Sequence, residues 1–217
     1  MEGTAGLLQF ERQAWASGCK RVAGVDEAGR GPLAGPVVAA AVVFSQTFIE
    51  QEEHRLFDTL TDSKQLTANQ RDRFFELLVN SPEVEIGIGF GDVPEIDEIN
   101  ILYATYLAMR RALQGLSVSP GYALIDGNRL PPDLPCAAET IIKGDDRAVS
   151  IAAASILAKV TRDRLMRDLS GQFPGYGWET NAGYGTSQHL DALSRLGVTP
   201  HHRVSFKPVH HILYQDK

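Results

Sequence analysis

The sequence contains little cysteine and no long apolar run. Cys19 and Cys136 are its two cysteines in 217 residues and form no CxxC pair, which argues against a disulfide framework and a structural zinc site. No stretch approaches the roughly 18 apolar residues of a membrane helix, and residues 1–20 lack the basic start and apolar core of a secretory signal. We therefore expect a cytoplasmic protein with no membrane partner.

The chain also lacks an excess of basic residues, since it has 21 Lys and Arg against 27 Asp and Glu, a formal net charge of -6. Proteins that bind nucleic acid usually present a basic surface, so the total charge argues against such a partner. The distribution of charge weakens this argument. Residues 83–98 hold six acids and no base, whereas residues 143–167 hold six bases and three acids, so one face could be basic.

The hydrophobic pattern predicts an α/β protein with an ordinary globular composition of 43% hydrophobic and 22% charged residues. Alternating and β-branched residues predict strands near 21–26, 35–44, 84–90, 121–126 and 138–142. Apolar residues at helical spacing predict helices near 67–79, 97–114, 148–168 and 186–196. This order favours a mixed sheet flanked by helices over a barrel.

A stretch rich in glycine and aromatic residues, 170–185, breaks this periodicity, and we expect a loop there. It divides the chain into an α/β domain over residues 1–170 and a helical C-terminal segment over residues 171–217 that packs on it. The two parts could also form one domain.

The densest chemical signal is GVDEAGRGP over residues 24–32. Asp26 and Glu27 end an apolar strand, and because neighbouring strand side chains point to opposite faces, both reach one site only where the strand ends and twists. A polar turn would explain the glycines but not the paired acids. A phosphate-binding P-loop is excluded because its Lys and Ser or Thr are absent, and a dinucleotide fingerprint is excluded because a strand follows instead of a helix.

Two further acids lie at the end of a predicted strand or shortly after one. Asp126 lies in IDGN, and Asp145 lies in KGDD, where it precedes Asp146. Each alone is more typical of a turn or a helix N-cap. If the strand ends converge, these acids and the earlier pair form a cluster whose mutual repulsion raises their pKa values unless cations bind. Carboxylates suit Mg²⁺ or Mn²⁺, and two such ions are a common device for phosphodiester hydrolysis.

Taken in order, these segments resemble type 2 ribonuclease H, and specifically bacterial ribonuclease HII, from about residue 21 to about residue 209. The segments that carry the resemblance are GVDEAGRGPLAGPVVAAAV, LTDSKQLT, EIDEINILYAT, YALIDGNRLP, IIKGDD, SIAAASILAKVTRD, GYGTSQH and HHRVSFKPV. The resemblance implies a ribonuclease H-like fold with a central mixed five-stranded sheet and a C-terminal helical segment.

The resemblance also implies an activity. Family members hydrolyse the RNA strand of RNA/DNA hybrids and incise 5' to ribonucleotides embedded in duplex DNA, leaving a 3'-hydroxyl and a 5'-phosphate. Hybrids and ribonucleotide-containing duplexes are thus the expected partners, and removal of ribonucleotides from DNA is the expected role. Two alternatives are an inactive hybrid-binding module and a related two-metal nuclease that acts on DNA. We expect a monomer.

The resemblance assigns residues to two groups. The catalytic and metal-binding acids, expected to hold two Mg²⁺ or Mn²⁺ ions, are Asp26, Glu27, Asp126 and Asp145; Asp146 leaves some ambiguity, although spacing to the Lys-Gly pair favours Asp145. The substrate-binding residues are Gly29, Arg30 and Gly31 at the 2'-hydroxyl, Tyr184 at the deoxyribose on the 3' side, Asp62, Ser63 and Lys64 at the DNA backbone, and Ser155, Lys159 and Arg162 near phosphates.

Other polar residues receive structural explanations. Solvation would explain Lys159 and Arg162 equally well. Asp163 is expected to pair with an arginine on the same helix. The six histidines, including His189 and His202, are expected on the surface or at phosphates rather than at a metal, because adjacent histidines diverge on a helix.

Overall fold

The computed structural model of the protein describes residues 6–52 and 66–214. Its strands are β1 Val22–Ala28, β2 Val37–Phe44, β3 Val84–Gly91, β4 Tyr122–Asp126 and β5 Ala137–Ile141. Its helices are α1 Gln9–Ala16, α2 Gln46–Glu52, α4 Ala68–Val79, α5 Val93–Gln114, the 3-10 helix η1 Gly144–Asp146, α6 Val149–Gln172, α7 Trp178–Asn181, α8 Ser187–Leu196 and α9 Lys207–Tyr214. None of these helices is long and apolar enough to cross a membrane.

The five strands form one mixed sheet in the order β3-β2-β1-β4-β5, which confirms the predicted fold class. β1 pairs antiparallel with β2 and parallel with β4. In the register of β1 with β4, Val25 lies opposite Ile125. Asp26 and Asp126 are the next residues along the two strands, so they lie at the same edge of the sheet.

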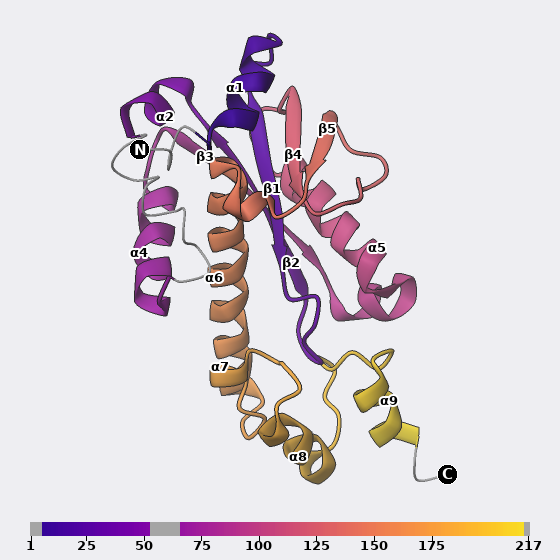
Figure 1. Ribbon diagram of the computed structural model, residues 1–217. Coiled ribbons are helices and arrows are strands. Elements are labelled where there is room, and N and C mark those ends of the chain that lie inside the picture. Colours follow the sequence, from indigo (N-terminus) through magenta and orange to yellow (C-terminus); the bar gives the residue numbers. More distant parts are fainter. Residues whose placement is uncertain (1–5, 53–65, 215–217) are drawn as a thin grey trace.

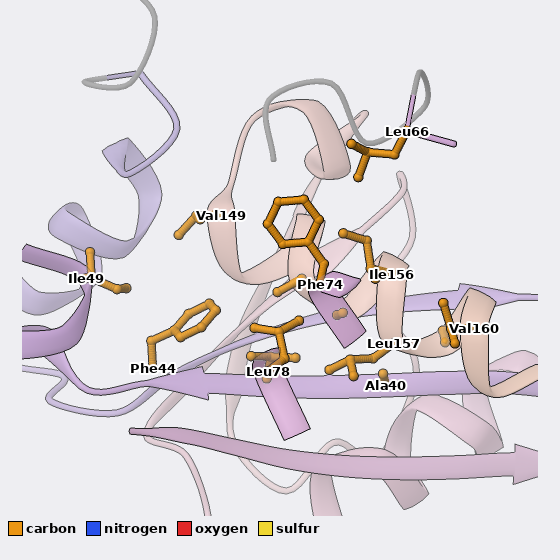
Figure 2. Close-up of a cluster of buried hydrophobic side chains, with 14 of the residues drawn as sticks. Ala40, Phe44, Ile49, Leu66, Phe74, Leu78, Val149, Ile156, Leu157 and Val160 are labelled. Carbon is orange, nitrogen blue, oxygen red and sulfur yellow. The ribbon is translucent and has the colours of Figure 1, made fainter. Parts of the chain in front are cut away.

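The sheet is covered by helices on both faces, and β2 is buried throughout because alternate residues face different helices. Ala40 and Phe44 pack with Leu157 of α6 and Leu78 of α4 in the cluster shown in Figure 2. The opposite face of β2 packs against α5 in a second cluster. Buried strands of this kind are continuously apolar, which explains why β2 reads as an uninterrupted hydrophobic run.

The long helix α6 lies very close to β1. A Cβ atom on Gly24 would lie 2.1 Å from the carbonyl carbon of Ser150, so only glycine allows the helix to approach this strand. The N-terminus of α6 is capped by Glu11 of α1, whose Oε1 accepts hydrogen bonds from the Ser150 amide at 3.0 Å and its hydroxyl at 2.6 Å. These contacts fix α6 relative to the end of β1.

The C-terminal segment packs against the far end of α6 and the loop that follows β1. One apolar cluster combines Leu33 and Ala34 of that loop with Met166 of α6, Trp178 of α7 and Val209 of α9. Figure 1 shows α8 and α9 at the end of the molecule opposite α1. The loop after β1, residues 29–36, is therefore held between the sheet and the C-terminal segment, and it is called the glycine-rich loop below.

Periodicity alone does not predict α1, α2 or α7. α1 spans 8 residues, α2 spans 7 and α7 spans 4, which is too short for a repeating apolar face. α7 lies within the stretch 170–185 that was expected to be a loop. It follows Gly177, whose φ of 72° lies in the left-handed region that favours glycine.

Candidate active site

Three carboxylates gather at one edge of the sheet. Asp26 and Glu27 are near the end of β1, and Asp126 is the last residue of β4. Asp26 is 6% exposed and hydrogen-bonds the hydroxyl of Ser155 on α6, while its Oδ1 accepts the Glu27 amide at 2.7 Å. The strand end thus brings both paired acids to one place, as the sequence predicts.

The electrostatics of this group disfavour three negative charges. Burial, followed by repulsion from Glu27 and Asp126, raises the pKa of Asp26 well above its usual range. Burial also raises the pKa of Glu27, although the Arg30 guanidinium, whose Nη1 lies 3.1 Å from Glu27 Oε1, opposes this shift. A bound cation would relieve both effects, so protons and divalent cations compete for these oxygens.

The segment that follows β5 contacts this group through Gly144, the residue before Asp145. Asp126 Oδ1 accepts a hydrogen bond from the Gly144 amide at 2.6 Å, and Gly144 opens the 3-10 helix that contains Asp145 and Asp146. Asp145 is half-buried, whereas Asp146 is exposed. Burial therefore agrees with Lys-Gly spacing in favouring Asp145 as the fourth acid of the site.

The acids fit divalent cations by their chemistry. Within residues 6–52 and 66–214, no three His, Cys, Asp or Glu side chains form a closed ligand group. Mg²⁺ seldom requires one, because it keeps several waters and is held by one or two carboxylates together with substrate phosphates. Hard oxygen donors with raised pKa values are suited to such an open site.

The glycine-rich loop after β1 borders a cleft beside the acids. The cleft has a volume of about 330 Å³ and is lined by Glu27, Ala28, Gly29, Arg30, Gly31, Ser155, Lys159, Arg162 and Tyr184. A second cleft of about 320 Å³ shares Glu27 and Arg30 with the first and contains Asp126. Glu27 thus lies where the two clefts meet, Asp126 lines the second cleft, and buried Asp26 lies beside them.

Position 29 of this loop requires glycine for two reasons, its backbone conformation and the closeness of Arg162. Gly29 has a φ of 96°, and a Cβ atom on it would lie 2.0 Å from Nε of Arg162. Gly31 faces Tyr184, since a Cβ atom on it would lie 3.5 Å from Cε1 of that ring. The structure therefore brings the predicted Gly-Arg-Gly segment and the predicted tyrosine together across the cleft.

The three predicted α6 residues have different environments. Ser155 contacts Asp26, and Lys159 lines the cleft with its Nζ 2.6 Å from Asp163 Oδ1. The expected pairing of Asp163 with an arginine is wrong, because the lysine one turn earlier is its partner. Arg162 is 1% exposed, so the alternative of a solvated arginine is also wrong. Its guanidinium donates to the carbonyl oxygens of Ala34, Pro36 and Ala182 at 2.9 Å each.

A second buried arginine at the loop was not predicted as a site residue. Arg203 is fully buried and donates from Nη2 to Gly29 O at 2.5 Å, from Nη1 to Arg30 O at 2.9 Å and from Nε to Gly35 O at 2.9 Å. Burial, reinforced by the charge of Arg162, lowers the pKa of Arg203 to about 9. Its position in the HHRVSF motif marks it in the sequence, but no local pattern indicates that it reaches the loop.

The expectation of surface histidines is wrong for two of them. His189 and His202 are 0% and 1% exposed, and their Nε2 atoms lie 3.0 Å apart beside Trp178. His189 Nδ1 lies 2.9 Å from the carbonyl oxygen of Tyr184, so this ring nitrogen donates and Nε2 accepts. The pair supports the loop that carries Tyr184. Asp62, Ser63 and Lys64 lie outside the described residues.

Comparisons with known proteins point to one family. The family model for ribonuclease HII matches residues 23–209. The ribonuclease HII of Ruegeria pomeroyi is 56% identical over 208 residues, which cover 96% of this chain and 85% of that protein. The ribonuclease HII of Rhodospirillum rubrum is 58% identical over 193 residues, which cover 89% and 87%.

Solved structures of ribonucleases H are also similar to this chain. The ribonuclease H2 of Pyrococcus horikoshii has a TM-score of 0.73 at 30% identity and covers 90% of this chain and 98% of that chain. A structure of Bst-RNase HIII in complex with Mn²⁺ has a TM-score of 0.72 at 21% identity and covers 91% and 70%, a likeness of fold.

Proposed function

The chain belongs to the ribonuclease HII family, and on that premise we propose that it incises duplex DNA 5' to an embedded ribonucleotide by a two-metal mechanism, leaving a 3'-hydroxyl and a 5'-phosphate. The coarser activity follows from the membership: it is a metal-dependent ribonuclease H that hydrolyses the RNA strand of RNA/DNA hybrids. Removal of ribonucleotides from DNA is the role that this cleavage would serve.

The observation that carries the proposal is the mutual repulsion of Asp26, Glu27 and Asp126 beside the cleft. We assign these acids and Asp145 as the ligands of two Mg²⁺ or Mn²⁺ ions. Ions held there would activate the attacking water and stabilise the leaving oxygen. The carboxylate oxygens of the acids would be the metal ligands. The hydroxyl of Ser155 on α6 holds the Asp26 carboxylate in place.

The cleft supplies the substrate contacts in this proposal. Gly29, Arg30 and Gly31 approach the 2'-hydroxyl closely, and Tyr184 packs on the next deoxyribose. The 2'-hydroxyl is the group that distinguishes RNA from DNA. Backbone groups that contact it beside the acids would therefore select a ribonucleotide over a deoxyribonucleotide.

Cationic side chains would position the substrate phosphates without reading sequence. Lys159 at the cleft wall would contact a phosphate, whereas buried Arg162 holds the loop carbonyls. Asp62, Ser63 and Lys64 are proposed to contact the DNA backbone on the strength of the family resemblance alone.

Two adjacent acids provide the test of the metal assignment. We expect Asp145→Asn to reduce kcat on a duplex with one ribonucleotide by more than the roughly 10–100-fold typical of residues that only support a metal ligand. Asp146→Asn is the matched control, and we expect it to retain cleavage within a few fold. Both variants should still bind the duplex in a gel-shift assay, because the cleft is intact.

The comparison separates the alternatives. Undiminished cleavage by Asp145→Asn, or a loss confined to Asp146→Asn, would contradict the assignment. Tight binding by the parent chain without any cleavage in either metal would instead indicate a hybrid-binding module.

A further inference from the structure

Arg203 contacts the carbonyl groups of the glycine-rich loop and is not among the residues that line the cleft. Its guanidinium donates to the carbonyl oxygens of Gly29, Arg30 and Gly35, and its own amide donates to Leu33 O at 2.8 Å. Arg203 forms no salt bridge within the described parts of the chain. A buried charge is costly unless hydrogen bonds satisfy it, so these carbonyls are strongly tied to the guanidinium.

These bonds determine which way two peptide groups face. In a trans peptide group the C=O and N–H point in opposite directions. Since Arg203 holds the carbonyls of Gly29 and Arg30, the amides of Arg30 and Gly31 point away from it. Neither amide has an acceptor within residues 6–52 and 66–214. The other side of this segment is the cleft that both residues line with Tyr184.

We propose that Arg203 is a positioning residue for ribose recognition, which holds the Arg30 and Gly31 amides toward the cleft as a pair of fixed donors. The inference rests on the proposed function, because it requires a ribonucleotide in this cleft. The positive charge on the carbonyl side also polarises both peptide groups and makes their N–H groups stronger donors.

The same arrangement links the C-terminal segment to specificity. Arg203 follows His202 in the segment between α8 and α9, and its contacts reach back to the loop after β1. Arg162 holds the later part of the same loop through Ala34 and Pro36. Two arginines from different parts of the chain thus fix this loop before any substrate binds.

Discrimination in binding is the readout that separates positioning from general stability. In an Asp126→Asn background, which we expect to prevent cleavage, the dissociation constants are measured for a duplex with one ribonucleotide and for the same duplex made of DNA. We expect Arg203→Lys, which keeps the charge but loses the planar fork, to reduce the ratio of the two affinities roughly tenfold. Val209→Ala is the control, because it removes buried packing from the same segment without touching the loop carbonyls.

A ratio unchanged by Arg203→Lys, or reduced equally by Val209→Ala, would overturn the inference. A parent that binds both duplexes equally would overturn the proposed function and the inference with it.

Amide exchange tests the inference even if Arg203→Lys fails to fold. In the Asp126→Asn protein we expect the Arg30 and Gly31 amides to exchange rapidly in NMR spectra and to be protected by the ribonucleotide duplex but not by the DNA duplex. Protection before binding, equal protection by both duplexes or no protection by either would refute the proposed donors.

Discussion

At the residue scale, burial decides what each charged side chain can do. Lys159 and Arg162 are one turn apart on α6 and look alike in the sequence. Lys159 is partly exposed at the cleft and pairs with Asp163, whereas Arg162 is buried and holds loop carbonyls. Helical spacing predicted that both side chains face the site. It could not predict how deeply each is buried, because loop residues 29–36, which are distant from α6 in the sequence, cover Arg162.

The buried histidine pair predicts a loss of stability in acid. Burial, and then the neighbouring His189, lowers the pKa of His202 to about 4 from the usual 6.5. The unfolded chain therefore binds a proton between pH 6.5 and about 4 that the folded chain does not. The free energy of unfolding falls as pH decreases through this window, by up to about 3 kcal/mol from His202.

His202→Gln isolates this contribution, because glutamine keeps an amide donor near the position of Nε2 but does not titrate. Urea unfolding of both proteins from pH 7 to pH 4 gives the difference directly. We expect the free-energy difference between wild type and variant to shrink or reverse toward pH 4. A difference that is constant with pH would mean that His202 is not held neutral.

At the scale of elements, the sequence predicted all five strands and the four long helices because their apolar periodicity is strong. It predicted a cluster of Asp26, Glu27 and Asp126 on the condition that the strand ends converge, and the parallel pairing of β1 with β4 meets that condition for Asp26 and Asp126. It could not predict the two arginine contacts to the loop. These are long-range hydrogen bonds between irregular segments, which leave no periodic signal.

The close packing of α6 on β1 predicts a sharp contrast between two glycines. Gly24→Ala places a methyl group 2.1 Å from a backbone carbon of Ser150, which no rotamer change can relieve. We expect it to lower the free energy of unfolding by about 3 kcal/mol or more and to reduce cleavage as β1 shifts. Gly171→Ala on the same helix meets nothing within 4 Å and should be neutral or stabilising by up to about 1 kcal/mol.

Chemical denaturation of both variants, with cleavage measured in parallel, checks this contrast. Equal stability of Gly24→Ala and wild type would show that α6 does not approach β1 as closely as described.

At the scale of the whole molecule, a protein with a net negative charge has to bind a nucleic acid, which is a polyanion. The segment 143–167 looked basic in sequence, but Arg162 is buried and Arg164 pairs with Asp72 and Glu76 of α4. The cations at the clefts are Arg30, Lys159 and Arg129, besides the buried Arg162. Divalent cations at the acids would add positive charge to the few cations that line these two clefts in the described part of the chain.

The proposed function requires the strand-end acids to hold divalent cations against the phosphate on the 5' side of a ribonucleotide. The most direct measurement incubates a duplex bearing one ribonucleotide, and the same duplex made entirely of DNA, with the protein and Mg²⁺ or Mn²⁺, and maps the ends of the products. We predict a single incision on the 5' side of the ribonucleotide that leaves a 3'-hydroxyl and a 5'-phosphate and requires the metal, with the DNA duplex intact. Absence of incision with both metals, or cleavage of the DNA duplex, would contradict the account.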